Sequence, residues 1–97
     1  MKTKDKHKQA LIEAVKLGES NTILSLAVMG GDINVVDDNG NTLMMIAIQN
    51  GHGKLCYTLA PMGVDLKAEN KHGDTTLSLA IKHRCKELVF FQAAGAK

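Results

Sequence analysis

A recurrent spacing between similar segments constrains the fold of this chain more than any other feature. Residues 39–65 match a later segment when the sequence is shifted forward by 33 positions, and an earlier segment when it is shifted back by 33. The forward identities pair Gly40, Thr42, Ala47, Ile48, Leu55 and Ala60 with Gly73, Thr75, Ala80, Ile81, Leu88 and Ala93. The backward identities pair Ala47, Gly51, Leu59, Gly63 and Asp65 with Ala14, Gly18, Leu26, Gly30 and Asp32. Self-similarity at a period of this size is typical of supersecondary units that stack and bury their apolar faces against each other.

The middle copy resembles the ankyrin repeat, whose pattern runs G-x-T-P-L-H-x-A-A-x-x-G-H, then a second apolar helix, then G-A-D-V-N. Residues 40–52 read GNTLMMIAIQNGH, and residues 63–66 read GVDL. Weaker forms end the other two copies, and the three copies together cover nearly the whole chain. The chain departs from the pattern where the family has Pro-Leu-His, which is replaced by Leu-Met-Met at 43–45 and by Thr-Leu-Ser at 76–78. The pattern of glycines and alanines is kept.

This resemblance implies an all-α fold, an ankyrin-repeat solenoid of about three stacked helix-turn-helix repeats with short β-hairpin fingers. We expect one domain over residues 1–97, with a first repeat at 5–37, a middle repeat at 38–70 and a last repeat at 71–97. A chain of this length buries roughly 60 to 70% of the surface that its unfolded form exposes, so its stability is expected to be modest. One Tyr and two Phe are the only aromatic residues. The core must therefore be built from Leu, Ile, Val, Ala and Met.

Apolar spacing and helix-end signals predict two helices in each repeat. The expected helices cover residues 8–17 and 21–29 in the first repeat, 42–50 and 54–62 in the middle repeat, and 75–83 and 86–94 in the last. Ser20 or Asn21 is expected to cap the second of these helices, and Thr42 the third, because their side-chain oxygens can accept a bond from an unpaired backbone N–H.

The ends of the inner helices follow the repeat. Gly18 and Gly51 stand where a helix ends on a left-handed residue, a position that Arg84 takes in the last repeat. Met44 occupies a buried position of the repeat and is expected in the core. Met45 replaces the histidine of the family pattern, and its place, at the edge of the core or in an exposed groove, stays open.

Turn signals predict two projecting segments, a first finger at residues 35–42 and a second finger at residues 69–75. Asn39-Gly40 favours a tight hairpin because both central residues tolerate positive φ. His72-Gly73 lies at the corresponding tip of the second finger.

The last repeat ends in an apolar run at residues 88–91. Between Leu88 and Gly95 the chain is one residue short of the 33-residue register, so the orientation of Phe90 and Phe91 stays open. A terminal repeat normally has a polar outer face that keeps the protein soluble. We therefore expect this end to be covered by further chain, by a partner subunit or by a twofold mate.

The net charge of +2 is slight, and the cations crowd into residues 1–8. That run fits a solvated N-terminal cap, and the alternative is a tail that binds nucleic acid or an anionic membrane surface. The first 30 residues lack the apolar core of a signal peptide, and no window approaches the ~18 apolar residues of a membrane-spanning helix. No membrane insertion is expected, and nucleic acid is not the expected partner.

The two cysteines are expected to stay reduced. The spacing between Cys56 and Cys85 does not match the 33-residue period, so they occupy different places in their repeats. A disulfide between them is not expected, and two reduced thiols fit a cytoplasmic or nuclear protein.

No set of residues in the sequence supports catalysis, so we expect no enzyme, no cofactor and no metal. Structural zinc needs paired Cys or His ligands, and residues 83–85 have no second pair to complete a site. Ser20, Ser25 and Ser78 lie at helix starts or on helix surfaces, without the glycines that expose a nucleophilic serine. The resemblance implies instead that His52 hydrogen-bonds to backbone between neighbouring layers.

The resemblance also implies where a partner binds, since family members use fingertip residues and the exposed side of the inner helix. In the middle copy the matching positions are Val36, Asp38, Asn39, Asn41, Gln49 and Asn50. In the last copy they are Glu69, Lys71, His72, Asp74, Lys82 and His83. This mixture of acid, base and amide predicts a polar, moderately salt-sensitive contact with another protein, and no small-molecule substrate.

The leading functional hypothesis is an intracellular protein-interaction module that serves as a scaffold, an adaptor or a regulatory binding domain. The alternative is an assembly subunit, or the N-terminal ankyrin segment of a larger protein, buried through its apolar C-terminal end and able to associate with itself there.

Overall fold

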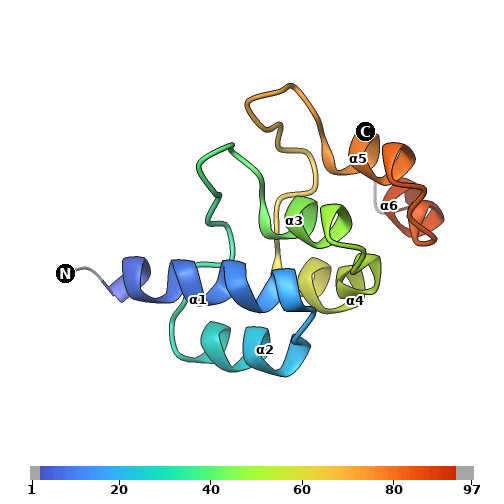
Figure 1. Cartoon of the computed structure of the whole chain (residues 1–97). Coiled ribbons are helices and arrows are strands. Elements are labelled where there is room, and N and C mark those ends of the chain that lie inside the picture. Colours follow the sequence, from blue (N-terminus) through green and yellow to red (C-terminus); the bar gives the residue numbers. More distant parts are fainter. Residues whose placement is uncertain (1–2, 94–97) are drawn as a thin grey trace.

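The computed structural model describes residues 3–93 of the 97-residue chain, with side-chain environments for residues 7–87, 89, 91 and 92 (Figure 1). The helices are α1 Thr3–Leu17, α2 Ser20–Val28, α3 Leu43–Gln49, α4 Cys56–Leu59, α5 Thr76–Lys82 and α6 Leu88–Ala93, and two 3-10 turns, η1 Gly53–Leu55 and η2 Ala60–Met62, flank α4. Figure 1 shows α1, α3 and α5 following one another as an inner row, each with α2, α4 or α6 as its pair. The row of helix pairs agrees with the stacked repeats expected from the sequence.

The two fingers lie on one side of this row (Figure 1). They contain no strand within residues 3–93, so the expected β-hairpins reduce to tight turns, and the first finger has a single antiparallel bridge between Val36 and Thr42. In the Asn39-Gly40 pair only Gly40 has a positive φ, of 77°. Its N–H donates to the carbonyl oxygen of Asp37 at 3.0 Å. The two central residues of the turn are therefore Asp38 and Asn39, one position earlier than the expected pair Asn39 and Gly40.

The second finger repeats this turn with the Asn70 amide in place of the Asp37 carboxylate, whose Oδ1 accepts from the N–H groups of Asn39 and Asn41 at 2.9 Å. The N–H of Gly73 donates to the carbonyl oxygen of Asn70 at 3.0 Å, and the Oδ1 of Asn70 accepts from the N–H groups of His72 and Asp74 at 2.9 and 3.0 Å. Asn70 thus organises its own turn, because a side-chain amide oxygen can satisfy two backbone donors at once.

The inner helices begin and end as the sequence predicts. The hydroxyl of Thr42 accepts from the N–H of Met45 at 3.2 Å, and Thr75 forms a reciprocal capping box with Ser78 at the start of α5. Helix α2 differs from its prediction, because it begins at Ser20 after Glu19 and no side chain caps it. The expected cap by Ser20 or Asn21 is therefore wrong.

The outer half of the middle repeat is the least regular part of the stack. The single helix expected over residues 54–62 is divided into η1, α4 and η2. Pro61 lies in η2 and has no N–H, so regular i to i−4 bonding cannot continue through it. Helix α1 begins at Thr3, earlier than expected, and α6 begins at Leu88, later than expected.

The core runs through the middle of the inner row. Met44, Met45 and Ala47 are fully buried, which settles the open question about Met45. Phe91 is also fully buried, so it belongs to the core and not to an apolar outer face, whereas the side chain of Phe90 lies outside the described residues. No helix within residues 3–93 is long and apolar enough to span a bilayer.

Candidate functional site

We call concave the face formed by the two fingers, which lie on one side of the row (Figure 1), and by the exposed residues at the C-terminal ends of α3 and α5. Of the residues expected to contact a partner, the structure leaves exposed Val36, Asp38, Asn39, Gln49, Asn50, Glu69, Lys71, His72, Lys82 and His83. These ten side chains combine carboxylates, ammonium groups, amides and imidazoles, with one valine. They can form hydrogen bonds and ion pairs with another polar surface.

Asn41 does not belong to this exposed set. Its side chain is 6% exposed. Its Oδ1 accepts from the Nδ2 of Asn70 at 2.8 Å and from the Nε2 of Gln49 at 3.4 Å, while its Nδ2 donates to the Oδ2 of Asp37 at 3.1 Å. The amide therefore ties the two fingers and α3 together. The position of Asn41 in the family pattern does not predict this role, because the role depends on a hydrogen bond with Asn70 in the second finger.

A backbone bond reinforces this link between the fingers. The N–H of Lys71 donates to the carbonyl oxygen of Asn39 at 2.9 Å. A Cβ added at Gly40 would lie 3.2 Å from the backbone nitrogen of Lys71, so the close approach of the two turns requires a small residue there. The fingertips are held in place before any partner arrives.

Two other expected contact residues make internal bonds. The Nδ2 of Asn50 donates to the carbonyl oxygen of Ile46 at 2.7 Å, so this exposed amide folds back on the end of α3. Asp74 is half-buried, and its Oδ1 accepts from the hydroxyl of Ser78 at 3.4 Å. Both side chains are less available to a partner than the residues at the fingertips.

A small hollow of about 240 Å³ extends the concave face toward α1. Its lining combines cations from the helix with acids from the first finger: Lys8, Gln9, Ile12, Lys16, Asp37, Asp38 and Asn39. None of the residues expected to contact a partner protein lies in α1. The spacing of Lys8 and Lys16, two helical turns apart on one side, was the available signal, but only the folded chain brings the acidic fingertip opposite them.

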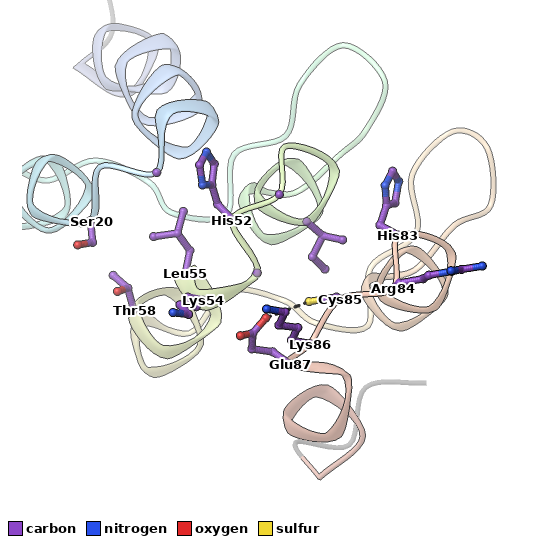
Figure 2. Close-up of a pocket in the computed structure, with 14 residues that line it drawn as sticks. Ser20, His52, Lys54, Leu55, Thr58, His83, Arg84, Cys85, Lys86 and Glu87 are labelled. Atoms are coloured by element: carbon purple, nitrogen blue, oxygen red, sulfur yellow. Dashed lines mark hydrogen bonds between the residues drawn. The ribbon is translucent and has the colours of Figure 1, made fainter.

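A larger hollow lies elsewhere, along the edge where each inner helix turns into its outer segment. We call it the edge groove, and its volume is about 650 Å³. Its lining is Gly18, Ser20, Ile48, Gly51, His52, Gly53, Lys54, Leu55, Thr58, His83, Arg84, Cys85, Lys86 and Glu87. Figure 2 shows Lys54 on the middle repeat and Lys86 with Glu87 on the last repeat, while the side chain of Arg84 extends away from them.

Three equivalent turns form this edge. Gly18, Gly51 and Arg84 each have a positive φ, of 74°, 79° and 52°. The residue after each of them donates its N–H to the carbonyl oxygen five positions earlier, at 2.8 or 2.9 Å. The expectation that Arg84 takes the place of a helix-ending glycine is confirmed.

His52 closes the edge between the first and middle repeats. Its Nε2 lies 3.0 Å from the carbonyl oxygen of Lys16, which confirms the expected bond between layers. Its ring also packs on Gly18, where an added Cβ would lie 2.8 Å from Nδ1. Glycine is therefore required at position 18 both by its backbone conformation and by the neighbouring imidazole.

Cys85 holds the position in the last repeat that His52 holds in the middle one. Its Sγ donates to the Oε1 of Glu87 at 3.3 Å, and a Cβ added at Gly53 would lie 2.5 Å from that Sγ. Burial raises the pKa of the Cys85 thiol, and its hydrogen bond with the Glu87 carboxylate also acts in this direction. Burial, with smaller contributions from Glu87 and Cys85, raises the pKa of Cys56 to about 11.

Both thiols are free in the structure and protonated near neutral pH. Since the thiolate is the reactive form of cysteine, neither group is activated as a nucleophile. Within the part of the chain that the structure describes, no three His, Cys, Asp or Glu side chains group as metal ligands would.

The comparison with known families agrees with this geometry. No curated protein matches the chain at a significant level. The sequence profile of the family described as "Ankyrin repeats (3 copies)" matches residues 5–91, which includes most of every helix pair in the row and both fingers. With that match over most of its length, and with three helix pairs stacked in one row, the chain belongs to the ankyrin repeat family.

Proposed function

We propose that this protein binds another protein through its concave face, and that it serves as a scaffold, an adaptor or a regulatory binding domain. Ankyrin repeats are generally protein-interaction modules and are typically not enzymes. The observation that carries the proposal for this chain is the cross-linked pair of fingers. The Asn41–Asn70 side-chain bond and the Lys71–Asn39 backbone bond hold the fingertips in one arrangement.

A preformed surface favours binding because little conformational entropy is lost when the partner docks. The exposed residues Asp38, Glu69, Lys71 and Lys82 present charges of both signs on this face. Contacts between such charges are screened by salt, so the affinity should fall moderately as ionic strength rises. With two fingers the contact is at or below the usual ~800 Å² per partner.

A double charge reversal tests the concave face. Asp38→Lys combined with Lys82→Glu keeps the net charge and changes two exposed side chains on the first finger and α5. We expect this variant to lose most of the partner protein recovered in a pull-down from cell extract, with recovery measured by quantitative mass spectrometry.

The matched control is Glu13→Lys combined with Lys67→Glu, which reverses one acid and one base at exposed positions outside the proposed face. We expect the control to retain the partner. Full recovery by the concave-face variant, or equal loss with both variants, would contradict the proposal.

A second candidate function is self-association through the last helix. Val89 on α6 is 74% exposed, which supports an apolar contact at this end of the row. Phe91 is turned into the core, so the apolar end is smaller than the sequence suggested. Light scattering across a range of concentrations tests this candidate: a dimer that Val89→Asp converts to a monomer would support it, and a monomer at all concentrations would contradict it.

A cytoplasmic or nuclear location also stays a proposal. It is supported by the two free thiols, since a reducing compartment keeps such groups unpaired. Fluorescence microscopy of the tagged protein in its source cells tests it, and secretion into the medium would contradict it.

A further inference from the structure

The edge groove shares His83 with the concave face, but the rest of its lining is distinct and has its own chemistry. It runs along the three turns that join inner and outer segments, whereas the fingers project from the opposite ends of the inner helices (Figures 1 and 2). Its volume of about 650 Å³ is more than twice the 240 Å³ of the hollow beside the first finger. A volume of this size is in the range of sites that hold a small ligand or a few residues of a peptide.

The groove is open because the last repeat has the small side chain of Cys85 at the position where the middle repeat has the imidazole ring of His52. At Gly18 an added Cβ would meet the imidazole of His52 at 2.8 Å, whereas at the equivalent Gly51 nothing lies within 4 Å of an added Cβ. The equivalent of that imidazole is Cys85, whose thiol bonds to Glu87 and does not reach over Gly51. The backbone turn of the middle repeat is therefore left accessible at this edge.

The charged groups on the two sides of the groove are predominantly cationic. Lys54 and Lys86 are exposed and stand on the middle and last repeats. The carboxylate among the lining residues, Glu87, is half-buried and accepts the hydrogen bond of the Cys85 thiol. Two ammonium groups thus face the solvent at the groove, and the carboxylate is engaged with a neighbour.

We propose that the edge groove is a second interaction surface and that it binds an acidic, extended peptide segment of a partner protein. Carboxylates of the peptide pair with Lys54 and Lys86. A small apolar side chain lies against Ile48 and Leu55, and the hydroxyls of Ser20 and Thr58 are available to the peptide backbone.

The lining favours a peptide over a nucleic acid. It contains no Phe, Tyr or Trp on which a base could stack, and of its two imidazole rings that of His52 already packs on Gly18, whereas base stacking is a main source of affinity for single strands. Two lysines on opposite sides do not form a continuous track for a phosphate backbone. Gly51, where nothing lies within 4 Å of an added Cβ, permits a peptide backbone to approach closely.

Fluorescence anisotropy with a labelled acidic peptide tests this proposal. The probe is a fluorescein-labelled nine-residue peptide of glutamates around a central leucine, and its counterpart is the same peptide with lysines in place of the glutamates. The whole chain is titrated at low ionic strength. We expect saturable binding of the acidic peptide, weakening with added salt because the contact is electrostatic, and no binding of the basic peptide.

The groove variant is Lys54→Glu, and the matched control is Lys67→Glu, an exposed lysine that lies outside both the groove lining and the concave face. Both change the net charge equally at exposed positions, so circular dichroism should show both folded. We expect the groove variant to bind the acidic peptide about five- to tenfold more weakly than the wild type, and the control to stay within about twofold.

Chemical-shift mapping in labelled protein gives a second measurement. We expect the amides of Gly53, Lys54 and Cys85 to shift on addition of the acidic peptide more than those of the fingertips. No saturable binding would overturn the proposal, and so would equal weakening by both variants. Binding of a labelled thymidine oligonucleotide at the same amides, without binding of the acidic peptide, would overturn it in favour of a nucleic acid.

Discussion

The two junctions between neighbouring repeats are built from the same backbone but closed by different side chains. At the first junction the imidazole of His52 reaches the carbonyl oxygen of Lys16 and covers Gly18. At the second, Cys85 takes the equivalent position; its thiol donates within its own repeat, to the Oε1 of Glu87, and packs on Gly53 without covering Gly51. At this edge of the row the same backbone turn therefore supports a tied layer at the first junction and an open groove at the second, while the second junction is tied at the fingers.

The difference extends into the helices. Ile48 in α3 is 3% exposed, whereas its equivalent Ile81 in α5 is 57% exposed. The last repeat also ends its inner helix on Arg84, a non-glycine residue with a positive φ. Sequence equivalence in a repeat protein thus fixes the backbone path, while the neighbour on each side decides how much each position contributes to stability.

The largest expected effect comes from truncating these two isoleucines. Ile48→Ala should destabilise the protein by about 2–4 kcal/mol because a buried side chain leaves a cavity, and Ile81→Ala by less than about 0.5 kcal/mol because its side chain is largely in solvent. Urea unfolding of both variants measures the free energies. Equal losses of unfolding free energy in the two variants would contradict the difference in burial between Ile48 and Ile81.

Gly53→Ala should also destabilise, although alanine ordinarily favours a helical segment over glycine by roughly 0.5–1 kcal/mol. The added Cβ would lie 2.5 Å from both the Sγ of Cys85 and the Oε1 of Glu87, so these two side chains must move and lose their hydrogen bond, or the last repeat must shift. We expect a loss of about 1–3 kcal/mol. Urea unfolding of Gly53→Ala and of the double variant Gly53→Ala with Glu87→Ala checks the cause, since removing Glu87 should recover part of the loss. A stabilised Gly53→Ala variant would show that the second junction is looser than described.

His52→Ala removes the bond that ties the first junction, and we expect a loss of about 1 kcal/mol, the usual contribution of one hydrogen bond. Cys85→Ala removes a thiol whose hydrogen bond stays within the last repeat, so its effect should be smaller. Thermal unfolding of the two variants gives the order. A larger loss of stability for Cys85→Ala than for His52→Ala would contradict the conclusion that the first junction is the more tightly bonded one at this edge.

Arg84→Gly should have the smallest effect and the opposite sign. A left-handed conformation costs a non-glycine residue about 1–2 kcal/mol, which glycine avoids. We expect a stabilisation of about 0.5–1 kcal/mol after the greater flexibility of glycine in the unfolded chain is included. Gly51→Ala, at the equivalent turn with a φ of 79°, is the matched control and should destabilise. Unfolding midpoints of both variants test the prediction.

Much of the fold could be predicted because it depends on local signals that recur with the 33-residue period. Thr42 and Thr75 cap their helices through bonds to residues three positions away, and Gly18 and Gly51 end theirs through their own φ. The inter-layer role of His52 followed from the family pattern. These features can be predicted without knowing which residues far apart in the sequence are in contact.

The remaining features depend on contacts between repeats. The burial of Asn41 requires Asn70 of the next finger, and the edge groove requires knowing which side chains fail to reach across a junction. The apolar spacing predicted one helix over residues 54–62 and did not indicate its division into η1, α4 and η2. Pro61 was a local signal for the irregular end of this segment.

Native-state hydrogen exchange tests the inequality of the two junctions most directly. The matched amides are those of Ile46 and Leu79, each of which donates to the carbonyl oxygen of its capping threonine at 3.0 Å. In a row of repeats a loosely joined end can open without the rest. We predict that Leu79 exchanges through an opening at least about 1 kcal/mol less costly than the one that exposes Ile46. Equal free energies of exchange for both amides, with the same dependence on urea, would contradict this account.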